Sequence, residues 1–184
     1  MVNIEIIDSD TVRGLVYDSL KFAEEKFGPR YGNYEYGGHD FWTHNPCLNY
    51  PTGGVVTILL NNCARDSAKE LVMQVSHESC HLLYATGKNG TNVLEEGLST
   101  YSSIEYFKKY FIDDDYAIIT TRAHENYHEA YILVEELLKV DSDAIKKIRL
   151  SKPIISQVEL QDLKDLNLSI PEESLLRLVM PFEY

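Results

Sequence analysis

The chain has 184 residues, and its 17 Lys and Arg against 29 Asp and Glu give a formal net charge of −12. Proteins that bind nucleic acids normally carry a basic surface, whereas the basic clusters here are the pairs 108–109 and 146–147, so we expect no DNA or RNA partner. With 44% apolar and 25% charged residues, the composition is that of one globular domain over residues 1–184.

The first ten residues, MVNIEIIDSD, lack the basic start and the apolar stretch of a signal peptide. No segment has the length of an apolar membrane span, so no membrane partner is expected. The three cysteines, Cys47, Cys63 and Cys80, are an odd number and do not suggest a disulfide framework. We therefore expect a protein of the reducing cytoplasm.

The predicted elements begin with a short strand at residues 2–7. A helix follows from Ser9 or Asp10 to Phe27, because apolar residues recur there at helical spacing. Residues 30–53 are rich in aromatic residues and glycine and predict a loose hairpin with long loops, in which His39 and His44 have no ligand spacing. Residues 54–61, GVVTILLN, predict a strand with both faces covered, since the apolar run is continuous.

Three longer helices are predicted after this strand. The first opens with a capping box, Ser67 with Glu70, and runs to about residue 85. The second spans about 93–110, an acidic turn follows at 113–115, and the third carries residues 124–136. Beyond residue 141, further capping boxes, Ser156 with Glu159 and Ser169 with Glu172, predict short helices that close the helical layer. Together these elements predict an α+β fold in which a small, mainly antiparallel sheet packs on a predominantly helical domain.

The first of these helices carries the sequence HESCH, with His77, Glu78 and His81. Residues four apart lie on one helix face, so the two imidazoles can bind one metal ion and Glu78 can face the water that the metal activates. The flanking residues are uncharged, which predicts a buried helix, and buried histidines are costly without a partner. The alternative is a pair of core histidines hydrogen-bonded to neighbours; Cys80 is expected to pack inside.

A catalytic zinc site uses three protein ligands, and Glu95 or Glu96 can supply the third. Asn92 is expected to cap the second helix with Glu95 as its capping-box partner, which leaves Glu96 for the metal. The Glu96 row continues with small polar residues, among them Thr100, a candidate for the second shell of the site. We therefore predict one Zn²⁺ per chain. A close approach of the two ligand-bearing helices would explain glycine at position 97.

HESCH followed by EEGLSTY resembles the gluzincins, the HExxH metallopeptidases whose third ligand is a glutamate in a second helix. This resemblance covers about residues 54–150 and implies a zincin-like core. It also implies that strand 54–61 lies at a sheet edge, where substrate adds as a further strand. The Gly-x-Met-Glu-Asn segment of the aminopeptidases in this family is absent from residues 28–62. An endopeptidase or processing enzyme is therefore favoured over an aminopeptidase.

A second HExxH stands at His124-Glu125-Asn126-Tyr127-His128. Its surroundings are more polar and no Glu-Gly segment follows it, so the first motif is favoured; a metal at His124 and His128 is the alternative. Tyr127 resembles the tyrosine that stabilises the oxyanion in the aminopeptidases, a role that His128 or His124 could also take. A tyrosine that serves only packing is the other interpretation.

These features together predict a zinc metallopeptidase. Glu78 would be the general base and Tyr127 the oxyanion donor, and the partner would be a peptide or protein substrate. The alternative is a catalytically degenerate relative that keeps zinc for stability and binds a protein. The sequence indicates neither the substrate nor the oligomeric state.

Overall fold

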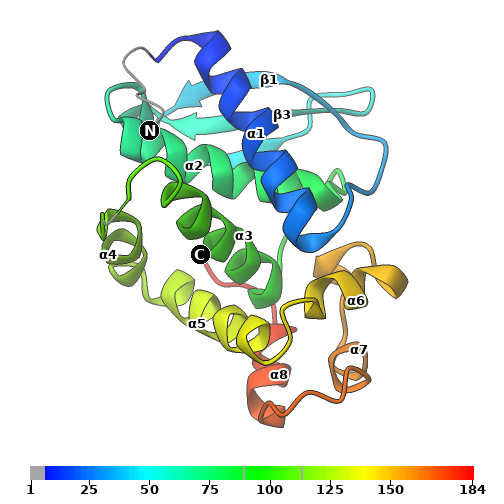
Figure 1. The fold of residues 1–184 in the computed structure, drawn as a ribbon. Helices are drawn as coiled ribbons and strands as arrows, with labels where there is room; N and C mark the ends of the chain where they lie inside the picture. Colours follow the sequence, from blue (N-terminus) through cyan, green and yellow to red (C-terminus); the bar gives the residue numbers. More distant parts are fainter. Residues whose placement is uncertain (1–6, 89, 113) are drawn as a thin grey trace.

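A computed structural model describes residues 7–88, 90–112 and 114–184 (Figure 1). The strand expected at 2–7 lies outside the described residues except for Ile7, which belongs to no strand. The described elements are, in chain order, α1 (Ser9–Phe27), β1 (Glu35–Trp42), β2 (Cys47–Asn49), β3 (Val55–Asn61), η1 (Asn62–Arg65), α2 (Ala68–His81), η2 (Leu82–Tyr84), α3 (Val93–Phe107), α4 (Tyr116–Arg122), α5 (Glu125–Val140), α6 (Ala144–Ser151), η3 (Ile155–Gln157), α7 (Leu160–Lys164) and α8 (Glu172–Leu178). The α+β class is as predicted.

The sheet has three strands in the order β1-β3-β2, with β3 in the centre. β1 runs parallel to β3, from Glu35 opposite Val55 to Trp42 opposite Asn61. β2 runs antiparallel to β3, with Leu48 opposite Ile58. The sheet is therefore mixed, and the prediction of a mainly antiparallel sheet was wrong. β3, the strand that precedes the histidine-bearing helix α2, is therefore central. This contradicts the edge position that the family resemblance implied for residues 54–61.

Residues 30–53 contain two strands that flank β3 instead of pairing as a hairpin. Residues 43–46 connect β1 to β2 across the end of β3. Two inter-strand spacings amount to about 10 Å, and four extended residues span about 13 Å, so this short connection suffices. The Asn61 side chain at the end of β3 donates to the His44 carbonyl at 3.0 Å and ties the connection down. Sequence proximity favoured a hairpin because nothing local reveals an inserted third strand.

Two helices cover one face of the sheet. α1 and α2 pack against it, and in Figure 1 α2 lies below the strands while α1 crosses in front of them. Along β3 the side chains of Val56, Ile58 and Leu60 are fully buried, while those between them are half-exposed. The expectation that both faces of this strand are covered was therefore wrong. Its branched residues on the outer face are tolerated because β1 and β2 protect the backbone on either side.

α3 is the central helix of the helical part. It packs against α2 on one side and against α5 on the other. A Cβ added at Gly97 would overlap the Ala130 carbonyl of α5 and lie 2.7 Å from Val134 Cγ2. The close approach that requires glycine is thus between α3 and α5, and the predicted cause, contact between the two ligand-bearing helices, was wrong.

The helix caps agree with the sequence patterns in part. Ser67 Oγ accepts from the Glu70 amide at 3.3 Å, and Asn92 Oδ1 accepts from the Glu95 amide at 2.9 Å, as predicted. α1 is capped by Asp8 instead of Ser9 or Asp10. The predicted boxes at Ser156 and Ser169 do not form, and Glu159 and Pro171 precede those helices instead. Several residues near these helix ends have side chains that can cap. Local patterns therefore predict the presence of a helix better than the identity of its capping residue.

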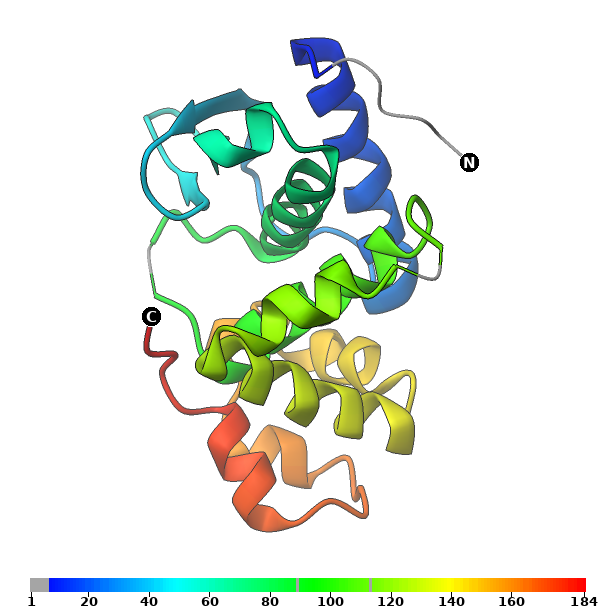
Figure 2. The same cartoon turned by 90° about the vertical axis from the view of Figure 1, so that its left-hand side faces the viewer.

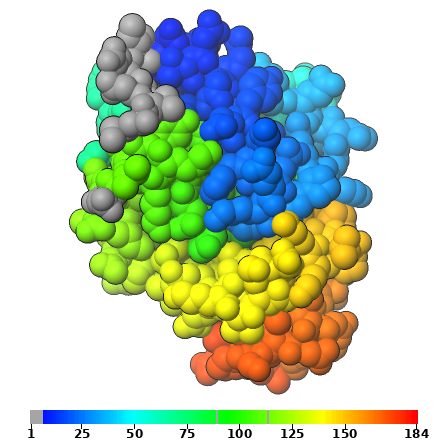
Figure 3. Space-filling view, in the orientation of Figure 1, coloured from blue at the N-terminus to red at the C-terminus, as the bar shows by residue number. Residues whose placement is uncertain are grey.

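The chain after α5 forms α6, η3, α7 and α8 and then returns to the stretch that precedes α3. In the space-filling view, α1 covers the upper part of this face and the later segments cover the lower part (Figure 3). After α8, the Met180 carbonyl accepts from the Val93 amide at 3.0 Å, and the Phe182 amide donates to the Thr91 carbonyl at 3.0 Å. Figure 2 shows this red terminal segment beside the stretch that precedes α3. Within the described ranges, no helix combines the length and apolarity needed to cross a bilayer.

Candidate metal centre

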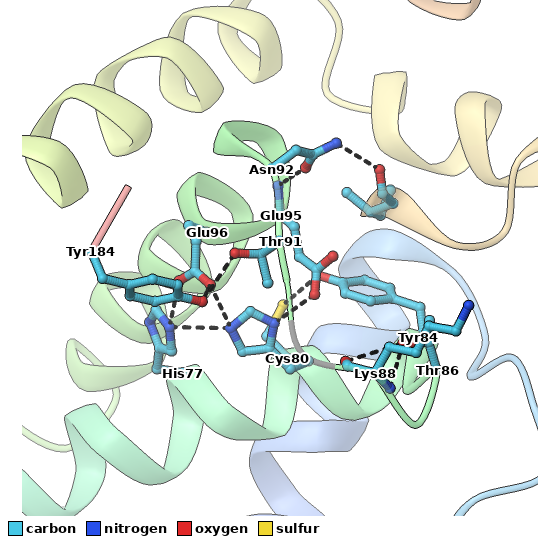
Figure 4. Close-up of polar contacts among 12 residues, drawn as sticks. His77, Cys80, Tyr84, Thr86, Lys88, Thr91, Asn92, Glu95, Glu96 and Tyr184 are labelled. Carbon is cyan, nitrogen blue, oxygen red and sulfur yellow. Dashed lines mark hydrogen bonds and ion pairs between the residues drawn. The ribbon is translucent and has the colours of Figure 1, made fainter. Parts of the chain in front are cut away.

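Three predicted ligands from two helices converge on one point. His77 and His81 project from one face of α2, and Glu96 projects from the first turn of α3. His77 Nε2 lies 3.2 Å from Glu96 Oε2 and 3.3 Å from His81 Nε2. His81 Nε2 lies 3.6 Å from Glu96 Oε1. Figure 4 shows His77 and Glu96 facing each other across this point.

This triangle of donor atoms fits a zinc ion. Zinc binds nitrogen and oxygen at about 2.0–2.1 Å in tetrahedral geometry, which places neighbouring ligand atoms about 3.3–3.4 Å apart. The three distances above lie close to that value, although the two that reach Glu96 run to different oxygens of its carboxylate. Among the described residues these three form a group whose ligand atoms all lie within 4.8 Å of one another. Two imidazoles and one carboxylate are also a donor set that zinc uses in catalytic sites.

The two buried candidate ligands His81 and Glu96 stabilise each other's charged forms. Burial acts to raise the pKa of Glu96, but the charge of His81 and hydrogen bonds from both histidines outweigh it and hold this pKa well below its usual value. Burial acts to lower the pKa of His81, but Glu96 and Glu95 outweigh it and raise this pKa well above its usual value. A cation in the centre would take over the role of the protons held here, since it is attracted by the same carboxylates.

Glu95 has a second role that the sequence analysis missed. Its amide is capped by Asn92, as the capping pattern predicted, but its carboxylate does not return to the cap. Instead Glu95 Oε1 lies 2.9 Å from Nδ1 of His81. A carboxylate on the far nitrogen fixes the tautomer of a ligand histidine and leaves Nε2 free to bind metal. The neighbouring glutamates 95 and 96 therefore contact opposite nitrogens of one imidazole.

Glu78 lies beside the three candidate ligands. It is 4% exposed, and it lines two cavities that meet at the metal centre. Burial raises the pKa of its carboxyl, although the nearby histidines act in the opposite direction. No hydrogen bond within the described part of the chain restrains its oxygens. A carboxylate in such surroundings can accept a proton and give it up again.

Tyr127 stands on the wall shared by the two cavities. Its ring centroid is 5.9 Å from that of His77 and 4.9 Å from that of Phe182. Burial, with Glu96 nearby, raises the pKa of its hydroxyl above the usual value, so the hydroxyl stays protonated and can donate. The helix α5 that bears it is positioned by the contact at Gly97.

The second HExxH does not form a matched pair of ligands. His124 precedes α5 as its N-cap residue and is exposed, whereas His128 lies inside the helix and is half-buried. The helical spacing that the motif predicts is therefore broken at its first histidine. His124 borders the smaller cavity, and His128 borders neither cavity. Thr100 is buried and lines the smaller cavity.

A large open cavity of about 590 Å³ leads to the metal centre. Its walls come from the β1–β2 connection, β2, α2, the 84–91 stretch and the chain end at Tyr184. A smaller cavity of about 220 Å³ opens on the other side of His77 and Glu78. The two together form a groove that passes the candidate metal centre.

Tyr184 is a residue of the site that sequence reasoning missed. Its hydroxyl donates to Glu96 Oε1 at 3.2 Å and lies 3.1 Å from Thr91 Oγ1 (Figure 4). The residue as a whole is 75% exposed, but its hydroxyl is partly buried against Glu96 and Thr91. This partial burial and the charge of Glu96 raise the pKa of the phenol to about 12, so it acts as a donor. Because it is 88 residues from Glu96 in sequence, no local pattern could reveal the contact.

Comparison of this chain with protein-family models, curated proteins and solved structures finds no match. The likeness to gluzincins therefore remains a prediction that rests on the motif residues.

Proposed function

We propose that this chain is a zinc-dependent metallopeptidase with a zincin-like arrangement of its site. The observation that carries the proposal is the convergence of His77, His81 and Glu96, whose polar atoms lie 3.2–3.6 Å apart, with the buried Glu78 beside them in the wall of a groove. A structural zinc site is closed by four protein ligands, whereas this one has three and opens to a cavity. That difference favours catalysis over a purely structural metal.

His77, His81 and Glu96 would hold the zinc ion, and Glu95 would orient His81 through its Nδ1. Zinc bound there would supply Lewis acidity, which lowers the pKa of water and polarises a carbonyl. Glu78 takes a proton from the water that attacks the scissile carbonyl and passes it to the leaving amine. The Tyr127 hydroxyl donates to the oxygen that becomes negatively charged.

The groove suits an extended peptide. Cys47 and Leu48 of the edge strand β2 line the large cavity, and the outer side of β2 pairs with no strand in the described part of the chain. A peptide can add to such an edge through main-chain hydrogen bonds. Substrate pairing is therefore proposed at β2, in place of the central strand β3. Because cavities flank the metal centre on both sides, cleavage within a chain is favoured over removal of a terminal residue.

The metal content of purified protein tests the first part of this proposal. We expect about one zinc per chain in the wild type, and zinc lost or greatly weakened in Glu96→Ala and His77→Ala. His128→Ala is the matched control, since it removes a histidine of the second HExxH and should retain zinc. Zinc that survives His77→Ala but is lost in His128→Ala would place the metal at the second motif.

The chemistry is tested separately with Glu78→Gln. This variant should bind zinc like the wild type and lose peptide hydrolysis by at least about 100-fold, the scale of a general base. Cleavage at the wild-type rate would refute the role of Glu78. A wild type that binds zinc but cleaves no peptide in a random library would favour the alternative, a zinc-stabilised protein that binds another protein.

A further inference from the structure

The smaller cavity beside the metal centre has a chemical character of its own. It lies between α2, α3 and the end of α4, and it shares Asn45, Pro46, His77, Glu78 and Tyr127 with the large cavity. Its remaining walls are mostly polar, with Glu70 toward the start of α2 and Thr100 on α3. A side chain of a peptide bound at the metal centre can enter it directly.

Glu70 gives this cavity a negative end. Its carboxylate accepts from the Tyr116 hydroxyl, from Gln74 Nε2 at 2.9 Å and from the Cys63 thiol at 3.7 Å. All three partners are neutral, and no ion pair joins Glu70 to a cation among the described residues. No lysine or arginine lines the cavity. The adjacent Lys69 forms an ion pair with Asp114 at 2.6 Å and therefore does not neutralise Glu70.

A second observation also points to a missing polar partner. Thr100 lines the same cavity and is 3% exposed, yet its hydroxyl makes no hydrogen bond in the described structure. A buried hydroxyl without a partner costs about 1–3 kcal/mol. A bound group with N–H donors would satisfy it, because a threonine hydroxyl can accept as well as donate.

The dimensions require a long side chain. Glu70 and His77 are seven residues apart in α2, which is about 10 Å along the helix axis. The half-buried Met73 lines the cavity between them and offers an apolar surface. Lysine and arginine have methylene stems that pack on apolar surface while the charged end reaches a carboxylate. A short or acidic side chain would leave Glu70 unpaired or repelled.

We propose that the smaller cavity binds the side chain of a lysine or arginine next to the scissile bond, with Glu70 as the partner of its charge. This inference rests on the proposed function, since it names the substrate class of the same groove. Peptides with a basic residue beside the cleaved bond are the preferred substrates. The strongly acidic chain, with a net charge of −12, also attracts such peptides.

Two peptide libraries test this specificity. They are identical and randomised except for one central position, which is lysine in one and norleucine, a similar unbranched side chain without the charged amine, in the other. Retention on immobilised, zinc-loaded Glu78→Gln protein measures binding without cleavage, and mass spectrometry of digests by the wild type measures cleavage. We expect the lysine library to be retained at least about tenfold better, and cleavage sites to cluster next to lysine and arginine.

Glu70→Gln, combined with Glu78→Gln, should reduce the ratio of lysine to norleucine retention at least about tenfold. Glutamine keeps an acceptor for Tyr116, so the fold should survive, which circular dichroism checks. Glu136→Gln on the exposed face of α5 is the matched control, because it removes one negative charge outside both cavities and should keep the ratio.

The outcomes separate the two proposals. Cleavage without a basic preference, together with equal retention of both libraries, would overturn the inference and leave the metallopeptidase proposal intact. Retention that depends on lysine and on Glu70, without any cleavage by the wild type, would support the cavity and count against the peptidase. A lysine preference that persists in the Glu70 variant would overturn the assignment of Glu70.

Discussion

Glu95 Oε1 lies 2.9 Å from Nδ1 of His81, on the side of the ring opposite Glu96. The imidazole is thus held between carboxylates from adjacent residues of α3, one at each nitrogen. Both side chains are buried, so this contact is shielded from water and has one orientation. The first turn of α3 therefore supplies both a candidate ligand and the group that orients a second ligand.

Glu95→Ala is expected to lower the affinity for zinc by about 10- to 100-fold, because His81 loses the acceptor that fixes its tautomer. Competition with a chromophoric chelator measures the dissociation constant. Glu136→Ala, on the exposed face of α5, removes the same charge from the chain and should bind zinc like the wild type. Equal affinities of the two variants would contradict the orienting role.

The contact between α3 and α5 predicts opposite effects for two glycine substitutions. Gly97→Ala should decrease the free energy of unfolding by about 2 kcal/mol or more, because the methyl group overlaps the Ala130 carbonyl. Gly14→Ala in α1 has no atom within 4 Å of its new methyl group and should increase stability by about 0.5–1 kcal/mol. Chemical denaturation measures both. If Gly97→Ala were more stable than the wild type, α3 and α5 would be able to move apart without a loss of folding free energy.

Local spacing was sufficient to predict which three side chains meet. The i, i+4 pair on α2 and the cap at Asn92 fix the directions of His77, His81 and Glu96, since helical geometry determines which residues share a face. The start of α3 at Val93 followed from the same cap. These features depend on residues close together in sequence.

Long-range contacts could not be predicted in this way. β3 is central because β1 and β2, which a short connection joins, pair with its two edges. Tyr184 contacts Glu96 although the two residues are 88 positions apart in sequence. The capping box suggested a structural role for Glu95, but its carboxylate turns to His81 because a buried imidazole is the stronger partner. The reason for Gly97 lay in α5, whose position no pattern near Gly97 indicates.

The ion pair between α5 and α8 predicts a pH-dependent contribution to stability. Glu129 accepts from Arg177 Nε at 3.1 Å and Nη2 at 2.6 Å. These hydrogen bonds lower the pKa of Glu129 below its ordinary 4.5. A lowered pKa stabilises the folded state above the unfolded-state pKa, and this contribution is lost as the pH falls through the folded-state pKa.

Glu129→Gln should therefore be less stable than the wild type at pH 7 by about 0.5 kcal/mol, a value discounted because both side chains are partly exposed. The difference should be constant from pH 8 to about 5 and shrink below 4.5. Denaturation curves at each pH measure it. A difference that grows on acidification would contradict the assigned sign.

Arg149 joins three segments that are far apart in sequence, and its replacement predicts the largest loss of stability. The residue is 8% exposed, and its guanidinium donates to the carbonyls of Phe27 and Gly28 at 2.8 Å, of Pro29 at 2.6 Å and of Leu83 at 3.3 Å. The end of α1, the end of η2 and α6 are thereby held together. Carbonyls at helix ends need such donors when they are buried.

Arg149→Lys should reduce the free energy of unfolding by about 3 kcal/mol, because an ammonium group cannot reach carbonyls in several directions and leaves some of them unpaired. Arg122→Lys in α4 is the matched control, since that side chain is exposed and should change stability by less than about 0.5 kcal/mol. Urea denaturation of both variants measures the difference. If lysine at 149 were as stable as the wild type, the guanidinium would not be what holds these segments, and their apolar packing alone would have to account for it.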